Sequence, residues 1–132
     1  MKPHLLETID RLYDAMNRRD VAALRAIGTE SPEFSWESNA DELDAPGRLD
    51  GREVLAYSQE LFEIFDELET EVLERIDLDP DHLICVVRHR VRGAASGATV
   101  DRREVHLWTA RDDRIQSLRE YGTVEQARLA AR

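Results

Sequence analysis

The chain has 132 residues, of which 42% are hydrophobic and 35% charged, and its formal net charge is −10 at pH 7. This length predicts a single domain over residues 1–132 with a sizeable core. The negative charge argues against binding to nucleic acids or to anionic membrane surfaces. No apolar run approaches the roughly 20 residues of a membrane-spanning helix. The N-terminus lacks the apolar stretch of a signal peptide, so we expect a cytoplasmic protein.

Two helices are expected at the N-terminal end. Hydrophobic residues recur there every three or four positions, which predicts an amphipathic helix over residues 3–18. Asp20 is a suitable N-cap for a second, short helix over residues 21–27, and Gly28 is its expected stop signal. Both helices would present one apolar stripe to a core.

A short strand and a third helix are expected next. The segment EFSWES predicts a strand with Phe34 and Trp36 on one face, and the polar residues 39–50 predict a loop. Asp50 followed three residues later by Glu53 is typical of a capping box at a helix start. We expect this helix to end near residue 68 and to bury Val54, Tyr57, Leu61, Phe62, Phe65 and Leu68.

In the second half of the chain the hydrophobic period changes to two, which predicts strands. We expect strands over residues 71–78, 82–92, 100–110 and 115–121, and a terminal helix over 123–129. Turn-forming residues separate the strands, and small residues at 93–97 predict a hairpin. Helices followed by antiparallel strands indicate an α+β fold in which one curved sheet packs against helices.

Three side chains in the strand predicted over residues 100–110 are the strongest candidates for chemistry. Glu104, His106 and Trp108 lie two residues apart, so they share one face of the strand. A carboxyl group in an apolar pocket has a raised pKa, and a nearby imidazole can transfer a proton at neutral pH. The alternatives are a structural buried pair, or a strand register in which both groups face solvent.

Further residues are candidates for contact with a ligand. Five aromatic residues could line a pocket, with core packing as the alternative: Tyr13, Trp36, Tyr57, Phe62 and Trp108. Glu120 lies on the expected inner face of the last strand and would need a partner. Arg88 and Arg90 are candidate partners, although alternation favours an inward set of Leu83, Cys85, Val87 and His89. We interpret His89 as a core or interface histidine.

Other chemistries find little support in the sequence. The four histidines show no metal-binding spacing, so no metal site is predicted. Glycine-rich nucleotide-binding motifs and the G-x-S-x-G motif are absent, and no cofactor is expected. The single cysteine, Cys85, has apolar neighbours and is expected to be an inert buried thiol.

Three phrases together resemble a known family: YDAMNRRDVAALRAI, LDGREVLAY and HLWTARDDRIQSLREYGTVEQA. The chain resembles the SnoaL-like branch of the nuclear transport factor 2-like superfamily, over residues 5–129. Ketosteroid isomerases, scytalone dehydratases and polyketide cyclases also belong to that superfamily. The resemblance implies a cone-shaped α+β fold, in which a strongly bent antiparallel sheet wraps around about three helices of the N-terminal half. It further implies an open-ended pocket and a homodimer formed through the outer sheet face.

The resemblance also implies site residues. The general base of the ketosteroid isomerases corresponds to Glu37 or a neighbour, and their late-strand acid corresponds to Glu104. Their helical tyrosine corresponds to Leu12, next to Tyr13. The aspartate and histidine of SnoaL-type cyclases would be approximated by Glu104 and His106.

Two functions are therefore expected as alternatives. One is a cofactor-independent isomerase, cyclase or dehydratase that transfers a proton on a small apolar carbonyl compound. Glu104 or Glu37 would move the proton, and His106 or a tyrosine hydroxyl would stabilise the enolate. The other is a non-catalytic module of the same fold that binds a small ligand or assembles as a dimer. Neither function calls for a nucleic acid or a membrane as partner.

Overall fold

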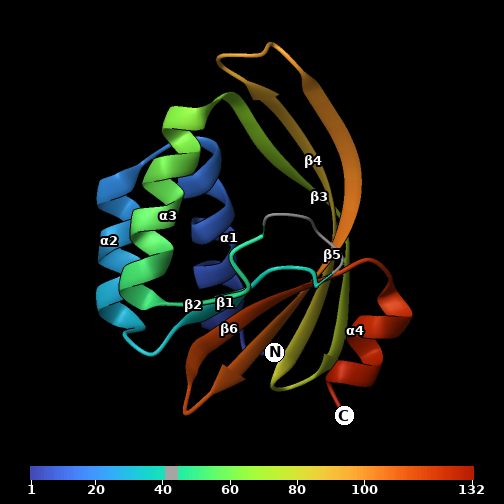
Figure 1. Cartoon of the computed structure of the whole chain (residues 1–132). Coiled ribbons are helices and arrows are strands. Elements are labelled where there is room, and N and C mark those ends of the chain that lie inside the picture. Colours follow the sequence, from blue (N-terminus) through green and yellow to red (C-terminus); the bar gives the residue numbers. More distant parts are fainter. Residues whose placement is uncertain (41–44) are drawn as a thin grey trace.

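The computed structural model describes residues 1–40 and 45–132 as an α+β fold (Figure 1). The elements are α1 (Pro3–Asn17), α2 (Val21–Glu30), β1 (Ser35–Glu37), β2 (Arg48–Asp50), α3 (Gly51–Ile64), β3 (Phe65–Asp79), β4 (His82–Gly93), β5 (Thr99–Arg111), β6 (Arg114–Tyr121) and α4 (Val124–Ala130). Helices α1 to α3 lie on one side of the sheet and α4 lies on the other. None of the helices in the described part of the chain has the length and apolarity needed to cross a membrane.

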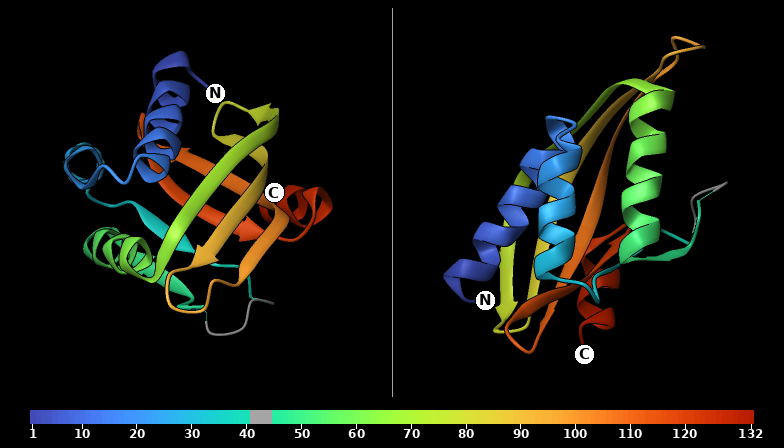
Figure 2. Two further views of the ribbon diagram at one scale, coloured as in Figure 1. Left: turned by 90° about the horizontal axis from the view of Figure 1, so that it is seen from above. Right: turned by 90° about the vertical axis from the view of Figure 1, so that its left-hand side faces the viewer.

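The sheet has six strands in the order β2-β1-β6-β5-β4-β3. Strands β3 to β6 form an antiparallel meander, and β1 pairs parallel to β6 and antiparallel to β2. The long strands curve around the three N-terminal helices, and the sheet does not close on itself (Figure 2). The expected α+β class with a bent, open sheet is confirmed.

Local capping signals position three of the helices as side-chain chemistry predicts. The Asp20 carboxylate accepts a hydrogen bond from the Ala23 N–H at the start of α2. Asp50 and Glu53 form the expected capping box of α3. A second capping box, formed by Thr123 and Gln126, begins α4.

Two boundaries in the first half of the chain differ from the prediction. Helix α2 passes through Gly28 and ends at Glu30, because helical packing that buries Ile27 outweighs the roughly 1 kcal/mol cost of a glycine within a helix. Residues Arg48–Asp50, expected in a loop, form strand β2 against β1. Residues 41–44 of that predicted loop lie outside the described residues.

The switch from α3 to β3 also differs from the prediction. The helix ends at Ile64, and the expected extension to Leu68 is wrong. Phe65 already has extended backbone angles and pairs with Gly93 of β4. Leu68 pairs with Val91 further along the same ladder. Cross-strand hydrogen bonds therefore override a helical hydrophobic period that continues past the end of the helix.

The core is divided between the two faces of the sheet. The concave face and α1 bury one cluster, which includes Leu5, Ile9, Tyr13, Leu83, Cys85, Val87, Trp108, Ala110 and Ile115. The convex face and α4 bury a second cluster of Ile84, Val105, Leu107 and Ala127. Strands β4 and β5 are thus covered on both sides at this end, which holds their side chains in fixed positions.

Candidate functional site

The three candidate side chains on β5 face the concave side of the sheet, toward the helices. Glu104, His106 and Trp108 are 4%, 3% and 2% exposed. Alternation along β5 places Val105 and Leu107 on the opposite face, under α4. Two ionisable groups are therefore buried on the inner surface, where each needs a partner.

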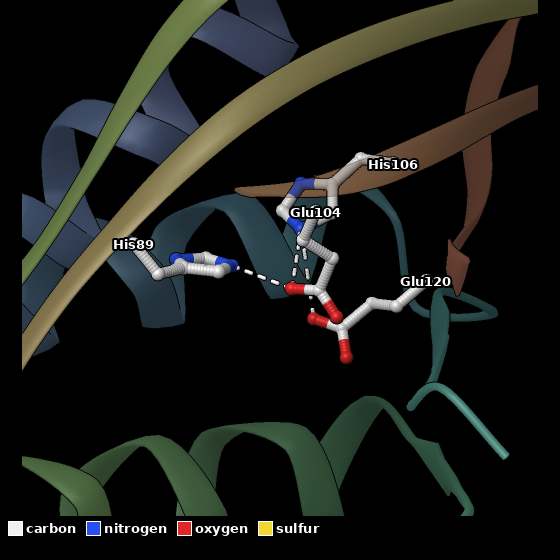
Figure 3. A group of neighbouring side chains, drawn as sticks. All are labelled: His89, Glu104, His106 and Glu120. Carbon is white, nitrogen blue, oxygen red and sulfur yellow. Dashed lines mark hydrogen bonds and ion pairs between the residues drawn. The ribbon is translucent and has the colours of Figure 1, made fainter. Parts of the chain in front are cut away.

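Cross-strand pairing supplies those partners. His106 lies directly opposite Glu120 of β6, and Glu104 lies opposite Val87 of β4, two residues before His89. Directly opposed and diagonal positions of neighbouring strands are within reach of long side chains. Figure 3 shows the four side chains converging from three adjacent strands. We call His89, Glu104, His106 and Glu120 the inner cluster.

The two imidazoles point the same ring atom into the inner cluster. His89 Nε2 lies 2.6 Å from Glu104 Oε2. His106 Nε2 lies 3.5 Å from Glu104 Oε2 and 3.6 Å from Glu120 Oε2. Within residues 1–40 and 45–132, His106 Nε2 has no hydrogen-bond partner. It interacts with the two carboxylates as an ion pair, at distances at or just beyond the limit for a hydrogen bond.

Hydroxyl groups fix the other nitrogen of each imidazole. His106 Nδ1 lies 2.7 Å from the Tyr13 hydroxyl, which also accepts a 2.9 Å hydrogen bond from Trp108 Nε1. His89 Nδ1 lies 2.8 Å from the Thr70 hydroxyl. Because Nδ1 is held on the outside, Nε2 of each ring is directed into the cluster.

The charges of the cluster are mutually stabilising. Burial opposes ionisation of Glu104, but His106 and His89 together lower its pKa to about 2. Burial also opposes protonation of His106, yet Glu104 and Glu120 raise its pKa to about 9. Burial raises the pKa of the Tyr13 phenol well above its usual value. At neutral pH the site therefore combines a carboxylate, an imidazolium and a neutral phenol.

A cavity of about 170 Å³ opens against the inner cluster. His89, His106 and Glu120 contribute to its wall, whereas Glu104 is not among the described residues that line it. The Trp36 and Tyr57 rings, stacked with centroids 5.3 Å apart, form another part of the wall. An adjoining hollow of about 380 Å³ shares Leu12, Leu24, Phe34, Val54 and Ser58 with this cavity and extends it between the helices.

Comparison with known proteins identifies the family of the chain. Residues 9–118 match the family described as the SnoaL-like domain. The chain belongs to the SnoaL-like domain family. The resemblance seen in the sequence is thereby confirmed, whereas no curated protein shows significant similarity to the chain.

Solved structures share the SnoaL-like fold at low identity. An NTF2-like protein of unknown function from Burkholderia pseudomallei is 20% identical, with 97% of this chain and 98% of that chain covered and a TM-score of 0.74. A candidate SnoaL-like polyketide cyclase from Jannaschia is 22% identical, with 99% and 94% covered and a TM-score of 0.71. TerC, co-crystallised with polyporic acid, is 17% identical, with 94% and 95% covered and a TM-score of 0.71. These similarities show the fold.

Several side chains singled out in this SnoaL-like sequence lie outside the cavity. Glu37 is exposed, because it follows Trp36 on β1 and neighbouring residues of a strand face opposite sides. Phe62 does not line the cavity; its ring lies 5.8 Å from the Arg19 guanidinium. Arg88 bonds Asp101, so the expectation that it partners Glu120 is wrong.

Arg90 likewise does not reach Glu120. It lies 3.5 Å from Glu69 of the edge strand, with both side chains exposed. The partner of Glu120 is His106. Cys85 is fully buried, and burial raises the pKa of its thiol to about 11, as expected of an inert cysteine.

His89, which the sequence predicts to be a core or interface histidine, belongs to the inner cluster. The alternation that favoured an inward Leu83, Cys85 and Val87 includes His89, and that signal could have placed it with Glu104. Thr70 was missed altogether. It lies opposite His89 on β3, in a segment that the sequence assigned to no element.

Proposed function

We propose that the chain is a cofactor-independent enzyme that transfers protons on a small apolar carbonyl compound, as an isomerase, cyclase or dehydratase. The observation that carries this proposal is the buried His106 imidazolium in the cavity wall, whose Nε2 lies beside two carboxylates and has no hydrogen-bond partner in the described part of the chain. A positioned donor of this kind stabilises the negative charge that develops on a substrate oxygen.

The residues of the cluster divide the chemistry between them. His106 donates its Nε2 hydrogen to the carbonyl oxygen of the substrate. Glu120 lines the cavity and accepts a proton from the carbon next to that carbonyl. Glu104 is not among the described residues that line the cavity. It keeps His106 charged and orients His89, so it is a positioning residue.

The reaction balances without an added reagent. The C–H bond breaks, its proton passes to the Glu120 carboxylate, and its electron pair moves into an enolate whose oxygen is hydrogen-bonded by His106. Return of the proton to another carbon gives an isomer. Attack of the enolate carbon on a second carbonyl gives a ring, and the new alkoxide takes the proton back from Glu120. Loss of a β-hydroxyl group gives a dehydrated product, and that group leaves as water with the proton from Glu120.

The cavity fits an apolar ligand with an unsaturated or aromatic part. Most of its wall is apolar, and the stacked Trp36 and Tyr57 rings offer a flat surface. Proteins of this fold have been crystallised with small molecules: TerC with polyporic acid, and a Catenulispora acidiphila protein with trimethylamine. Both observations support a small-molecule substrate.

A proton-exchange assay tests the proposal. Steroids, polyketides and aromatic ketones are first ranked by the thermal stabilisation that they give the chain. The best binder is then followed by NMR in D₂O for exchange of the hydrogens next to its carbonyl. We expect Glu120→Gln and His106→Gln to slow the exchange by about 100-fold or more. The control Asp101→Asn, an exposed acid paired with Arg88, should leave it unchanged.

The second candidate function is binding without turnover, by a monomer or a dimer. The apolar cavity favours it, because a ligand could be held there with no chemistry. Binding with no exchange above the buffer rate, unaltered by Glu120→Gln, would replace the catalytic proposal with this one. Light scattering of the purified chain measures the oligomeric state, for which the family resemblance suggests a homodimer.

A further inference from the structure

The inner cluster brings together four side chains that commonly bind metals. His89, Glu104, His106 and Glu120 each offer one ligand atom, and these atoms lie within 4.8 Å of one another. We propose that the inner cluster binds one divalent transition-metal cation of the Zn²⁺ type. The sequence predicts no such site, because the ligands come from three strands and their spacing follows no histidine motif.

The donor set suits a transition metal. Imidazole nitrogens prefer Zn²⁺, Ni²⁺, Cu²⁺ and Fe²⁺, whereas Mg²⁺ and Ca²⁺ prefer oxygen ligands alone. Two imidazoles with two carboxylates resemble the mixed nitrogen and oxygen sets of zinc sites. Two carboxylates with two neutral imidazoles carry a charge of −2, which a divalent cation neutralises inside the fold.

The orientation of the imidazoles is the second observation in favour of a metal. A metal-bound histidine uses one ring nitrogen for the metal and donates the hydrogen of the other to a nearby oxygen. In this chain both Nδ1 atoms meet hydroxyl oxygens, those of Tyr13 and Thr70, and both Nε2 atoms point into the cluster. His106 Nε2 is also buried with no hydrogen-bond partner in the described chain. Its free nitrogen is aimed at the place where a cation would lie.

Two of the distances already match a tetrahedral site, and the others, which reach at most 4.8 Å, would have to adjust. Ligand atoms about 2.1 Å from a tetrahedral Zn²⁺ lie roughly 3.4 Å from one another. His106 Nε2 lies 3.5 Å from the nearest Glu104 oxygen and 3.6 Å from that of Glu120. The 2.6 Å contact between His89 and Glu104 would have to open by roughly 0.8 Å, because the cation replaces the shared proton.

Cation binding defines a second state of the site, which excludes the proposed reaction for as long as the cation is bound. The cation takes His106 Nε2, so that atom cannot donate a hydrogen to a substrate while the cation is bound. Because binding is measured without any substrate, this proposal can fail while the proton-transfer proposal stands, and the reverse.

Metal uptake by the whole chain tests the proposal. The protein is stripped with a chelator, incubated with Zn²⁺, Co²⁺ or Mg²⁺, desalted and analysed for bound metal, and each affinity is measured by titration. We expect one Zn²⁺ or Co²⁺ per chain, retention of no Mg²⁺, and visible absorption bands of tetrahedral Co²⁺. The double substitution H89Q and H106Q should abolish uptake. The control His4→Gln removes an exposed histidine on α1 and should retain one cation.

A further variant keeps all four ligands and guards against effects of misfolding. Thr70→Val removes the hydroxyl that orients His89, and should weaken Zn²⁺ binding by about tenfold or more. Circular dichroism checks the fold of each variant. Failure of the wild-type chain to retain one Zn²⁺, or uptake by the H89Q and H106Q variant equal to that of wild type, would overturn the proposal.

Discussion

Glu104→Gln should destabilise the metal-free chain in a pH-dependent way. The substitution keeps the shape of the side chain but removes a negative charge that faces both His89 and His106. A pKa of His106 raised from 6.5 to about 9 corresponds, at about 1.4 kcal/mol per unit, to about 3 kcal/mol of stabilisation, which Glu104 and Glu120 share. Removal of one partner from a buried ion pair has a comparable cost of about 3–5 kcal/mol.

The sign of the pH dependence follows from the direction of each shift. Because folding raises the pKa of His106, its contribution is complete below about pH 6.5 and is lost as the pH rises through about 9. Because folding lowers the pKa of Glu104 from 4.5 to about 2, its contribution is complete above about pH 4.5 and is lost as the pH falls through about 2. Both shifts contain the same interaction between Glu104 and His106, so their energies are not added.

Urea unfolding of wild type and variant in the presence of EDTA measures the effect. We expect the two free energies of unfolding to differ by up to about 3 kcal/mol between pH 5 and 6.5, and the difference to shrink as the pH approaches 9. NMR titration of the His106 ring should show its pKa below 9 in the variant, where Glu120 is the remaining carboxylate beside the ring. The control Asp101→Asn breaks an exposed pair with Arg88 and should cost less than about 1 kcal/mol. A gap that stays constant from pH 5 to 9.5 would refute the reasoning.

Two further predictions concern the groups around the cluster. Tyr13→Phe removes the hydroxyl shared by His106 Nδ1 and Trp108 Nε1, and unsatisfied buried nitrogens should lower the free energy of unfolding by about 1–3 kcal/mol, measured by urea titration. Cys85 should react with a thiol reagent only as fast as the chain opens, because it is fully buried and its thiol has a pKa of about 11. Fast labelling of the folded chain would contradict this.

The types of most elements could be predicted because their causes are local. The capping box at Asp50 and the period of two in β5 depend on residues close together in the chain. The end of α3 could not be predicted, because the backbone at Phe65 is extended by pairing with Gly93, 28 positions further along the sequence. Boundaries set by such distant pairing leave no local signal.

The same distinction applies to the candidate site. Glu104 and His106 lie on one strand, so alternation alone places them on one face. Contact with Glu120 and His89 depends on which residues of β4, β5 and β6 lie opposite one another. A shift of one residue in either pairing would separate the cluster, and the sequence contains no motif that sets that register.

The free edge of β3 meets a side chain of α1. An edge strand of 15 residues offers unpaired backbone groups to any extended segment of another chain. The Asn17 amide donates to the Thr70 carbonyl oxygen at 2.9 Å and accepts from the Thr70 N–H at 2.8 Å. It thus stands where a foreign strand would pair and divides the edge into two shorter stretches. The Thr70 hydroxyl also orients His89. The Asn17 amide therefore both hinders strand-to-strand aggregation and holds the backbone of the residue that orients His89.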